Sequence, residues 1–197
     1  MSLDPRDLRV GPAYELARGD ARAAAVDARR RRRVDLGDLI SVVFESRETL
    51  LAAAEEALRA ERIDDPGRVA AEADSFGLLL PPEGGLAASL FLEISDAAEL
   101  ASVLVELDGI SESVHLEIDG DRCPATVLPL GAAAEGAAPA AYLRFALSPS
   151  QREAWVEGAR VLLRVTHPRY SVSTELSDEK RAAIAADLIP APSAHPR

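Results

Sequence analysis

Apolar and polar residues alternate with a period of two in several short runs of the chain, which is the pattern of half-buried β-strands. These runs cover residues 34–44, 88–94, 114–118, 123–128, 142–147, 160–166 and 171–175. Between two of them, Asp119-Gly120 is a strong signal for a two-residue hairpin turn. Because proline cannot donate to a β-ladder, Pro124 predicts that the strand after this turn lies at an edge of the sheet.

Other segments have apolar residues three or four positions apart and capping residues at their starts, which predicts helices. The expected helices cover residues 13–32, 96–107 and 178–188, and others begin after Ser46, at Pro66 and after Ser148. In the helix after Ser46, the expected exposed face carries charges that pair with one another, as Glu55 does with Arg59 four positions later.

Hairpin signals outnumber strand–helix–strand signals, so we predict an α+β fold with a mostly antiparallel sheet and helices packed on one face. We expect a single domain over residues 1–189, with a helical part at about 1–76 and a strand-rich part at about 86–189. The Ala- and Gly-rich segment Gly131–Ala138 is expected to be a mobile loop and the tail 190–197 to be disordered. The expected core contains Val42, Phe44, Leu90, Leu92, Leu116 and Leu163.

Composition narrows the class of protein. The chain has 197 residues, of which 48% are hydrophobic and 28% charged, values that are ordinary for a globular protein. Its formal net charge of −11 argues against nucleic acid or an anionic membrane surface as the partner. The single cysteine, Cys123, suits a reducing compartment, and no run of about 18 apolar residues is present. We therefore expect a cytosolic protein.

The strongest sequence signals of an enzyme are absent, because the chain has no Gly-rich phosphate loop, G-x-S-x-G, paired C-x-x-C or H-E-x-x-H motif. Glu112 and His115 have the spacing of a di-iron carboxylate motif. This pair is better explained as a chance match, because it occurs once and lies on a predicted strand. The arginine run Arg29–Arg33 is interpreted as a basic helix end paired with acids of the next helix, rather than as a nucleic-acid patch.

Glu45 stands apart from the other carboxylates because it directly follows the apolar residues 42–44. A carboxylate in that place must be paired or lose several kcal/mol to desolvation. We therefore expect Glu45 to be at least partly buried and to meet an arginine, with Arg59, Arg62 or Arg144 as candidates. The remaining glutamates, Glu56 among them, fit either a charged helix face or part of a metal or catalytic site.

His167 is the other position of interest. Pro168 forces it into an extended conformation, and a bend follows, so that imidazole, guanidinium and phenol share a short corner with Arg169 and Tyr170. The corner fits either a ligand or catalytic histidine or a structural one.

Several short blocks of the chain occur in an order that resembles one bacterial family. They are Arg33-Val34, Gly37, Phe44-Glu45, Arg47-Glu48-Thr49, residues 58–63, Tyr142-Leu143-Arg144-Phe145 and His167-Pro168-x-Tyr170. The chain resembles bacterial domain-of-unknown-function family 3501, often encoded beside rubrerythrin and a cysteine-rich iron–sulfur oxidoreductase. It departs from the family at residues 51–56, which lack an aromatic residue and glutamines, and at 132–141, which replace an acidic stretch and a histidine.

The resemblance leaves three interpretations. The first is a cytosolic accessory or interaction protein linked to non-haem iron or oxidative-stress metabolism, which contacts a rubrerythrin-like or iron–sulfur redox protein. The second is a small-molecule or metal-dependent enzyme, and the third is a plain structural scaffold. For an enzyme the catalytic candidates are Glu45, Glu56 and His167, and the binding candidates are Arg59, Arg144 and Tyr170. We expect no resident cofactor or metal, and neither nucleic acid nor membrane as partner.

Overall fold

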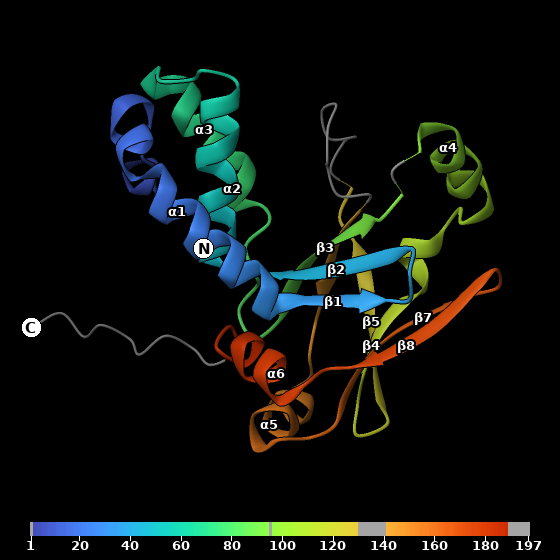
Figure 1. The fold of residues 1–197 in the computed structure, drawn as a ribbon. Helices are drawn as coiled ribbons and strands as arrows, with labels where there is room; N and C mark the ends of the chain where they lie inside the picture. Colours follow the sequence, from blue (N-terminus) through green and yellow to red (C-terminus); the bar gives the residue numbers. More distant parts are fainter. Residues whose placement is uncertain (1, 95, 130–140, 189–197) are drawn as a thin grey trace, which may run out of the picture. The chain divides into compact units, whose positions relative to one another are not determined.

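The computed structural model describes residues 2–94, 96–129 and 141–188, so the expected mobile loop Gly131–Ala138 and the tail 190–197 lie outside it. The chain forms two compact units (Figure 1). The helical unit contains residues 1–32 and 45–80, and the sheet unit contains residues 33–44 and those from 81 onward. Residues 33–44 therefore interrupt the helical unit in sequence and belong to the sheet. That residues 1–189 form a single domain stays a prediction.

The helical unit is built from a short 3₁₀ turn and three helices, and side chains cap the starts of the turn and of two of the helices. They are η1 (Pro5–Asp7), α1 (Gly11–Arg32), α2 (Arg47–Ala60) and α3 (Pro66–Gly77). Ser46 begins α2 with a capping box, because its hydroxyl accepts from the N–H of Thr49 while the Thr49 hydroxyl accepts from the N–H of Ser46. Asp65 caps α3. These local signals explain why the predicted starts of α2 and α3 are confirmed, whereas α1 begins two residues before its predicted start.

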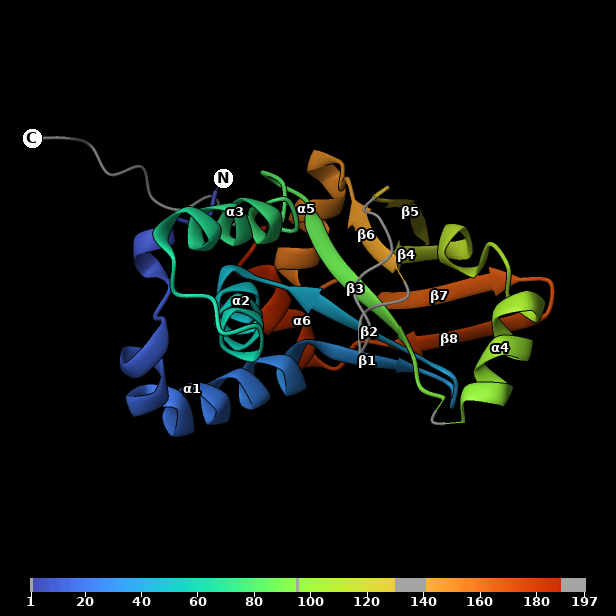
Figure 2. The same cartoon turned by 90° about the horizontal axis from the view of Figure 1, so that it is seen from above.

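Helix α2 lies between α1 and α3 and supplies the centre of the helical unit (Figure 2). Leu50, Ala54 and Leu58 of α2 are buried, as the helical spacing predicts. Helix α1 buries little, because only Tyr14 and two residues near its end are buried while Leu16 is 92% exposed. The long helix is therefore attached to α2 mainly by its polar side chains, which are described below.

The sheet unit is an eight-stranded sheet in the order β1-β2-β3-β6-β5-β4-β7-β8. Its strands are β1 (Arg33–Leu36), β2 (Ile40–Glu45), β3 (Leu86–Leu92), β4 (Val114–Ile118), β5 (Asp121–Val127), β6 (Ala141–Phe145), β7 (Val161–His167) and β8 (Tyr170–Glu175). All six strand pairs with a defined register are antiparallel, which confirms the α+β fold with an antiparallel sheet. The hairpin turn at Asp119-Gly120 is also confirmed, and both residues have the positive φ of the expected turn.

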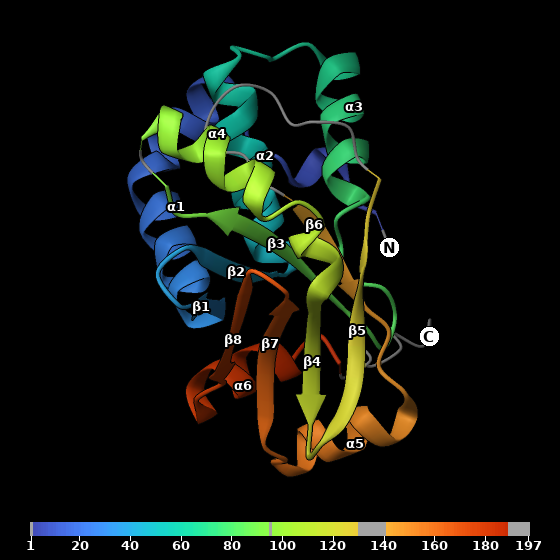
Figure 3. The ribbon, with the colours of Figure 1, turned by 90° about the vertical axis from the view of Figure 1, so that its right-hand side faces the viewer.

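The sheet curves into a near-barrel, and its core is enclosed on the concave side (Figure 3). Of the six expected core residues, Leu92 is half-buried and the other five are fully buried. Helices α5 (Pro149–Glu157) and α6 (Asp178–Ala185) lie at one end and add Trp155 and Ile184 to the core. Helix α4 (Ala97–Glu106) and η2 (Ile110–Ser113) lie at the other end and add Leu107 and Ile110.

The prediction that the strand containing Pro124 is an edge strand is wrong, because β5 lies between β4 and β6. Pro124 is opposite His115 of β4, and counting from the two-residue turn makes this a non-hydrogen-bonded pair. Pairing of β5 with β6 begins one residue later, at Ala125 opposite Phe145. Neither neighbour therefore needs the N–H group that proline lacks.

The near-barrel is closed by side chains rather than by a ladder between β1 and β8. The Tyr170 hydroxyl donates to the Leu36 carbonyl at 2.5 Å, and the Thr174 hydroxyl donates to the Asp35 carbonyl at 2.7 Å. We call this contact the β1–β8 seam. Gly37 lies beside it with a φ of +64°, and a Cβ there would be 2.4 Å from the Tyr170 hydroxyl oxygen. The glycine is therefore required by both its conformation and its neighbour.

This packing predicts that Gly37→Ala and Tyr170→Phe are coupled. Gly37→Ala should lower the free energy of unfolding by about 2 kcal/mol, from left-handed strain and the clash with the hydroxyl. In the Tyr170→Phe background the same change should cost only about 1 kcal/mol, because the hydroxyl is gone. Chemical denaturation measures both values. Gly120→Ala is the control, because Gly120 also has positive φ but open space at the Cβ position. If Gly37→Ala and Tyr170→Phe changed the free energy of unfolding by strictly additive amounts, the close contact at the seam would be contradicted.

Candidate functional site

The N-terminal segment covers the face of α2 that carries Glu55. The Glu55 side chain is only 2% exposed and accepts three hydrogen bonds from Arg9, two from its guanidinium at 2.7 Å and one from its backbone N–H at 3.0 Å. The expected surface pair between Glu55 and Arg59 is therefore wrong. Arg59 pairs instead with Glu15 of α1 at 2.7 Å. Spacing within one helix could not reveal that a segment 46 residues earlier would cover this face.

Glu56, a predicted catalytic candidate, is held by two residues of α1. Its Oε1 atom accepts from the Tyr14 hydroxyl at 2.8 Å and from Nε of Arg18 at 3.1 Å. Burial and the Glu56 carboxylate raise the pKa of Tyr14 to about 12. Burial opposes ionisation of Glu56, but the Arg18 and Tyr14 hydrogen bonds outweigh it, so the pKa of Glu56 is lowered. These contacts attach α1 to α2, which is a structural role for the carboxylate.

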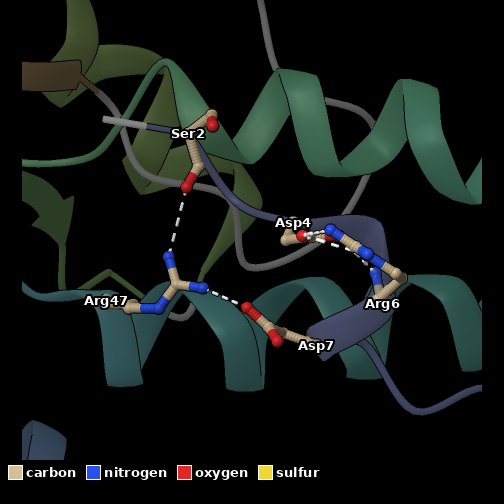
Figure 4. A network of polar contacts seen from close by, with 5 residues as sticks. All are labelled: Ser2, Asp4, Arg6, Asp7 and Arg47. Carbon is tan, nitrogen blue, oxygen red and sulfur yellow. Dashed lines mark hydrogen bonds and ion pairs between the residues drawn. The ribbon is translucent and has the colours of Figure 1, made fainter. Parts of the chain in front are cut away.

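Glu45 is buried, with 4% of its surface exposed, as the sequence predicts. Its Oε2 atom accepts from the Thr49 hydroxyl at 2.6 Å, one turn along the start of α2. That Glu45 meets an arginine stays a prediction. Nearby, the Arg47 guanidinium forms an ion pair with Asp7 and donates to the Ser2 carbonyl at 3.2 Å, which ties the N-terminal segment to α2 (Figure 4).

His167 has a hydrogen bond at each ring nitrogen. Its Nδ1 accepts from the N–H of Arg169 at 3.3 Å, so Nε2 carries the proton and donates to the carbonyl of Asp108 at 3.1 Å. The histidine thus joins the β7–β8 turn to the loop after α4. This arrangement corresponds to the structural alternative for the corner.

The other two candidates in the sheet unit have different positions. Tyr170 closes the β1–β8 seam through its hydroxyl. Arg144 is half-buried on β6, opposite Ala87 of β3 and Thr126 of β5. Since Glu45 and Glu56 belong to the helical unit while Arg144 and His167 belong to the sheet unit, their convergence at one site stays a prediction.

His115, which the sequence places on a predicted strand without a site role, is buried. It lies between Pro124 and Arg164 on the neighbouring strands. Burial and then the nearby Arg122 lower its pKa, and its Nδ1 atom has no hydrogen-bond partner among the described residues. Alternation along β4 alone would place the His115 side chain at the surface. The long side chains around the imidazole exclude water from it instead.

A small pocket opens in the sheet unit where β3, the end of α4 and η2 meet. Its volume is about 150 Å³. The lining is mostly aliphatic, with polar groups on the loop after α4, and consists of Leu90, Leu92, Leu104, Leu107, Asp108, Gly109, Ile110, Ser111 and Ala141. We call it the α4 pocket. The carbonyl bonded to His167 belongs to Asp108, so the histidine fixes the wall of the pocket without lining it.

The α4 pocket was not predicted from the sequence, although a signal for it exists. From Glu93 to Asp121 the chain has nine Asp or Glu residues and no Lys or Arg. Within this acidic stretch, Leu104 and Val105 are 50% and 79% exposed. An apolar pair on an acidic segment is unusual for a solvated helix and marks a surface of interest.

Charge pairing elsewhere agrees in part with the interpretation of the arginine run as a paired basic helix end. Arg30 and Arg31 pair with Asp27 of the same helix, and Arg33 pairs with Asp35 and Glu93. These partners lie one turn away or on the sheet, and pairing of the run with acids of the next helix stays a prediction. The described residues hold no group of three or more His, Cys, Asp or Glu side chains that could bind a metal ion. In the same part of the chain, no helix combines the length and apolarity needed to cross a membrane.

Comparison with known proteins places the chain in a family. The family model described as "Protein of unknown function (DUF3501)" matches residues 2–188. The chain belongs to this family. The chain is also similar to a solved structure of a protein of unknown function from Burkholderia pseudomallei K96243, which is 26% identical to it. That likeness covers 96% of this chain and 100% of the other, with a TM-score of 0.88. No curated protein matches the chain.

Membership of DUF3501 confirms the resemblance that was stated from the sequence blocks. The match spans both compact units, so the relative shares the helical part as well as the near-barrel. Neither the family nor the relative carries an assigned activity.

The Arg9–Glu55 pair predicts that two arginine substitutions differ in their effect on the free energy of unfolding. Arg9→Met should lower the free energy of unfolding by about 3 kcal/mol, because it leaves the buried Glu55 carboxylate with only one backbone donor. Arg6→Met is the matched control, since its partner Asp4 is more exposed, and it should leave the free energy of unfolding nearly unchanged. Urea denaturation at pH 7 compares the two. Equal effects would show that the pair contributes no more than a surface ion pair.

The raised pKa of Tyr14 predicts a pH-dependent loss of stability in alkali. An unfolded tyrosine ionises near pH 10, so the folded protein, with a Tyr14 pKa of about 12, gains stability below about pH 10 and loses it as the pH rises through 12. The difference in phenolate absorbance between wild type and Tyr14→Phe measures this pKa. Glu56→Gln should lower the pKa of Tyr14, because the contribution of the carboxylate is lost. The larger contribution, from burial, remains. A difference titration centred near pH 10 would contradict the buried contact.

Proposed function

We propose that this protein is a cytosolic accessory protein that binds a partner in non-haem iron or peroxide metabolism. The partner would be a rubrerythrin-like or iron–sulfur redox protein, and the iron would belong to that partner. The proposal takes its partner class from the gene neighbours that the family resemblance implies, and contact with the partner is the activity. The lone cysteine, Cys123, is buried, and its thiol pKa is raised by that burial, which suits a reducing compartment.

One observation carries this proposal: polar groups that could do chemistry already hold the fold together, whereas apolar groups beside the α4 pocket are exposed. Glu56 is bonded to α1, His167 to the loop after α4, and Tyr170 to the β1–β8 seam. Leu104 lines the α4 pocket and is half exposed, and Val105, the next residue of α4, is 79% exposed. Exposed apolar surface next to a pocket is typical of a protein-binding site.

The two alternatives account for fewer of these features. The α4 pocket, with about 150 Å³, is smaller than the roughly 300–1,000 Å³ that an enzyme site for a drug-sized or cofactor-sized molecule needs. A plain scaffold does not account for a half-exposed leucine in the wall of an open pocket. An interaction protein accounts for both the small volume of the pocket and the exposed apolar surface at its rim.

The proposal predicts saturable binding to an iron-loaded rubrerythrin-like protein from the same genome. Biolayer interferometry with the full chain immobilised is the measurement, and an unrelated acidic protein of similar size is the control for charge. Metal analysis of this chain after purification should find iron well below one atom per chain. Stoichiometric iron in this chain, or no binding to either the rubrerythrin-like or the iron–sulfur candidate, would contradict the proposal.

A further inference from the structure

The α4 pocket has the size of one side chain. Its volume of about 150 Å³ is close to that of a cavity which holds a benzene molecule, so it accepts one aliphatic or aromatic group and no more. Leucines from β3 and α4 form its walls, and Leu104 is half exposed at its edge. An anchor side chain from a partner would complete this wall and remove the exposed part of Leu104 from water.

The segment 104–113, which forms one end of the pocket, carries acidic side chains and no Lys or Arg. The carboxylates of Glu106, Asp108 and Glu112 are exposed, and no ion pair involves them among the described residues. Acids at the two ends of the same stretch are paired, as Glu93 is with Arg33 and Glu117 with Arg164. The carboxylates without a partner are therefore those on the segment that forms the pocket. Such a field attracts a basic segment and repels an acidic one.

The rim of the pocket is held in place before any partner binds. His167 donates to the carbonyl of Asp108 at 3.1 Å, and the N–H of Ile110 donates to the carbonyl of Leu107 at 2.9 Å. Gly109, between these residues, has a φ of +79° that allows the chain to turn from α4 into η2. A preformed rim reduces the entropy that binding must overcome.

We propose that the α4 pocket docks a basic segment of a partner protein, with one aliphatic anchor inserted into the pocket and lysines or arginines beside the three carboxylates. This inference rests on the proposed function, because it names the surface and the partner chemistry of the same contact. The occupant is a protein segment because the pocket holds one side chain beside the half-exposed Leu104, and it is basic because Glu106, Asp108 and Glu112 of the same segment have no ion pair among the described residues.

The test uses two labelled 16-residue amphipathic peptides that share their leucines and differ only in carrying lysine or glutamate on the polar face. Fluorescence anisotropy with the full chain should show binding of the lysine peptide, weakening as salt is raised from 20 to about 300 mM. The glutamate peptide should not bind. Equal binding of both peptides would overturn the charge argument.

Variants locate the contact. Leu104→Glu should weaken binding of the lysine peptide at least tenfold, and the combined change Glu106→Gln with Glu112→Gln should weaken it and flatten its salt dependence. Val156→Glu on α5 is the matched control. Val156 is 53% exposed and has Glu153 and Glu157 close in sequence, but it does not line the α4 pocket. Circular dichroism checks that each variant folds. Equal loss with Val156→Glu would overturn the assignment of the pocket.

Two further outcomes separate this inference from the proposed function. If the iron-loaded partner binds wild type and Leu104→Glu equally, the docking surface is wrong while the proposed function stands. If the lysine peptide binds as expected but neither redox candidate does, the proposed function fails while the surface stands. Sedimentation of the full chain completes the test, because a dimer that Leu104→Glu dissociates would make a second copy the occupant and overturn the proposal.

Discussion

The contact on which the sheet unit depends is the β1–β8 seam, where two side-chain hydroxyls replace a strand ladder. A curved sheet of eight strands leaves two edges with unpaired backbone groups, which are a liability in water and a template for aggregation. Tyr170 and Thr174 satisfy consecutive carbonyls of β1 and bring the two edges together. The concave side then becomes an enclosed core, into which α5 and α6 insert Trp155 and Ile184.

The helical unit is held together by a different kind of interaction. Its long helix α1 has little apolar surface to bury, so carboxylates on α2 bind it and the N-terminal segment through Arg9, Tyr14 and Arg18. Isolated surface ion pairs contribute little, but Glu55 is buried and bidentate, and hydrogen bonds of that geometry are among the stronger ones. The carboxylates that most resembled a catalytic set are therefore the groups that this weakly apolar helix requires.

Local signals predicted much of this fold, while contacts between distant segments could not be predicted. The hairpin at Asp119-Gly120 and the capping boxes at Ser46 and Ser148 depend on neighbouring residues, and the structure confirms them. The burial of Glu55 and the interior place of β5 depend on segments far away in the chain. For the candidate site, the sequence identified residues by chemical type. The α4 pocket instead arises from aliphatic residues of separate elements, whose types carry no functional signal.

The interruption of the helical unit by residues 33–44 has a consequence for how the protein is made. Neither unit is a continuous piece of the chain, so no single cut releases either one intact. The seam joins Leu36 to Tyr170 across 134 positions. During synthesis β1 and β2 leave the ribosome well before β8, the strand that completes their enclosure. Such long-range pairing slows folding, so the nascent chain presents an open sheet edge while these 134 positions are translated.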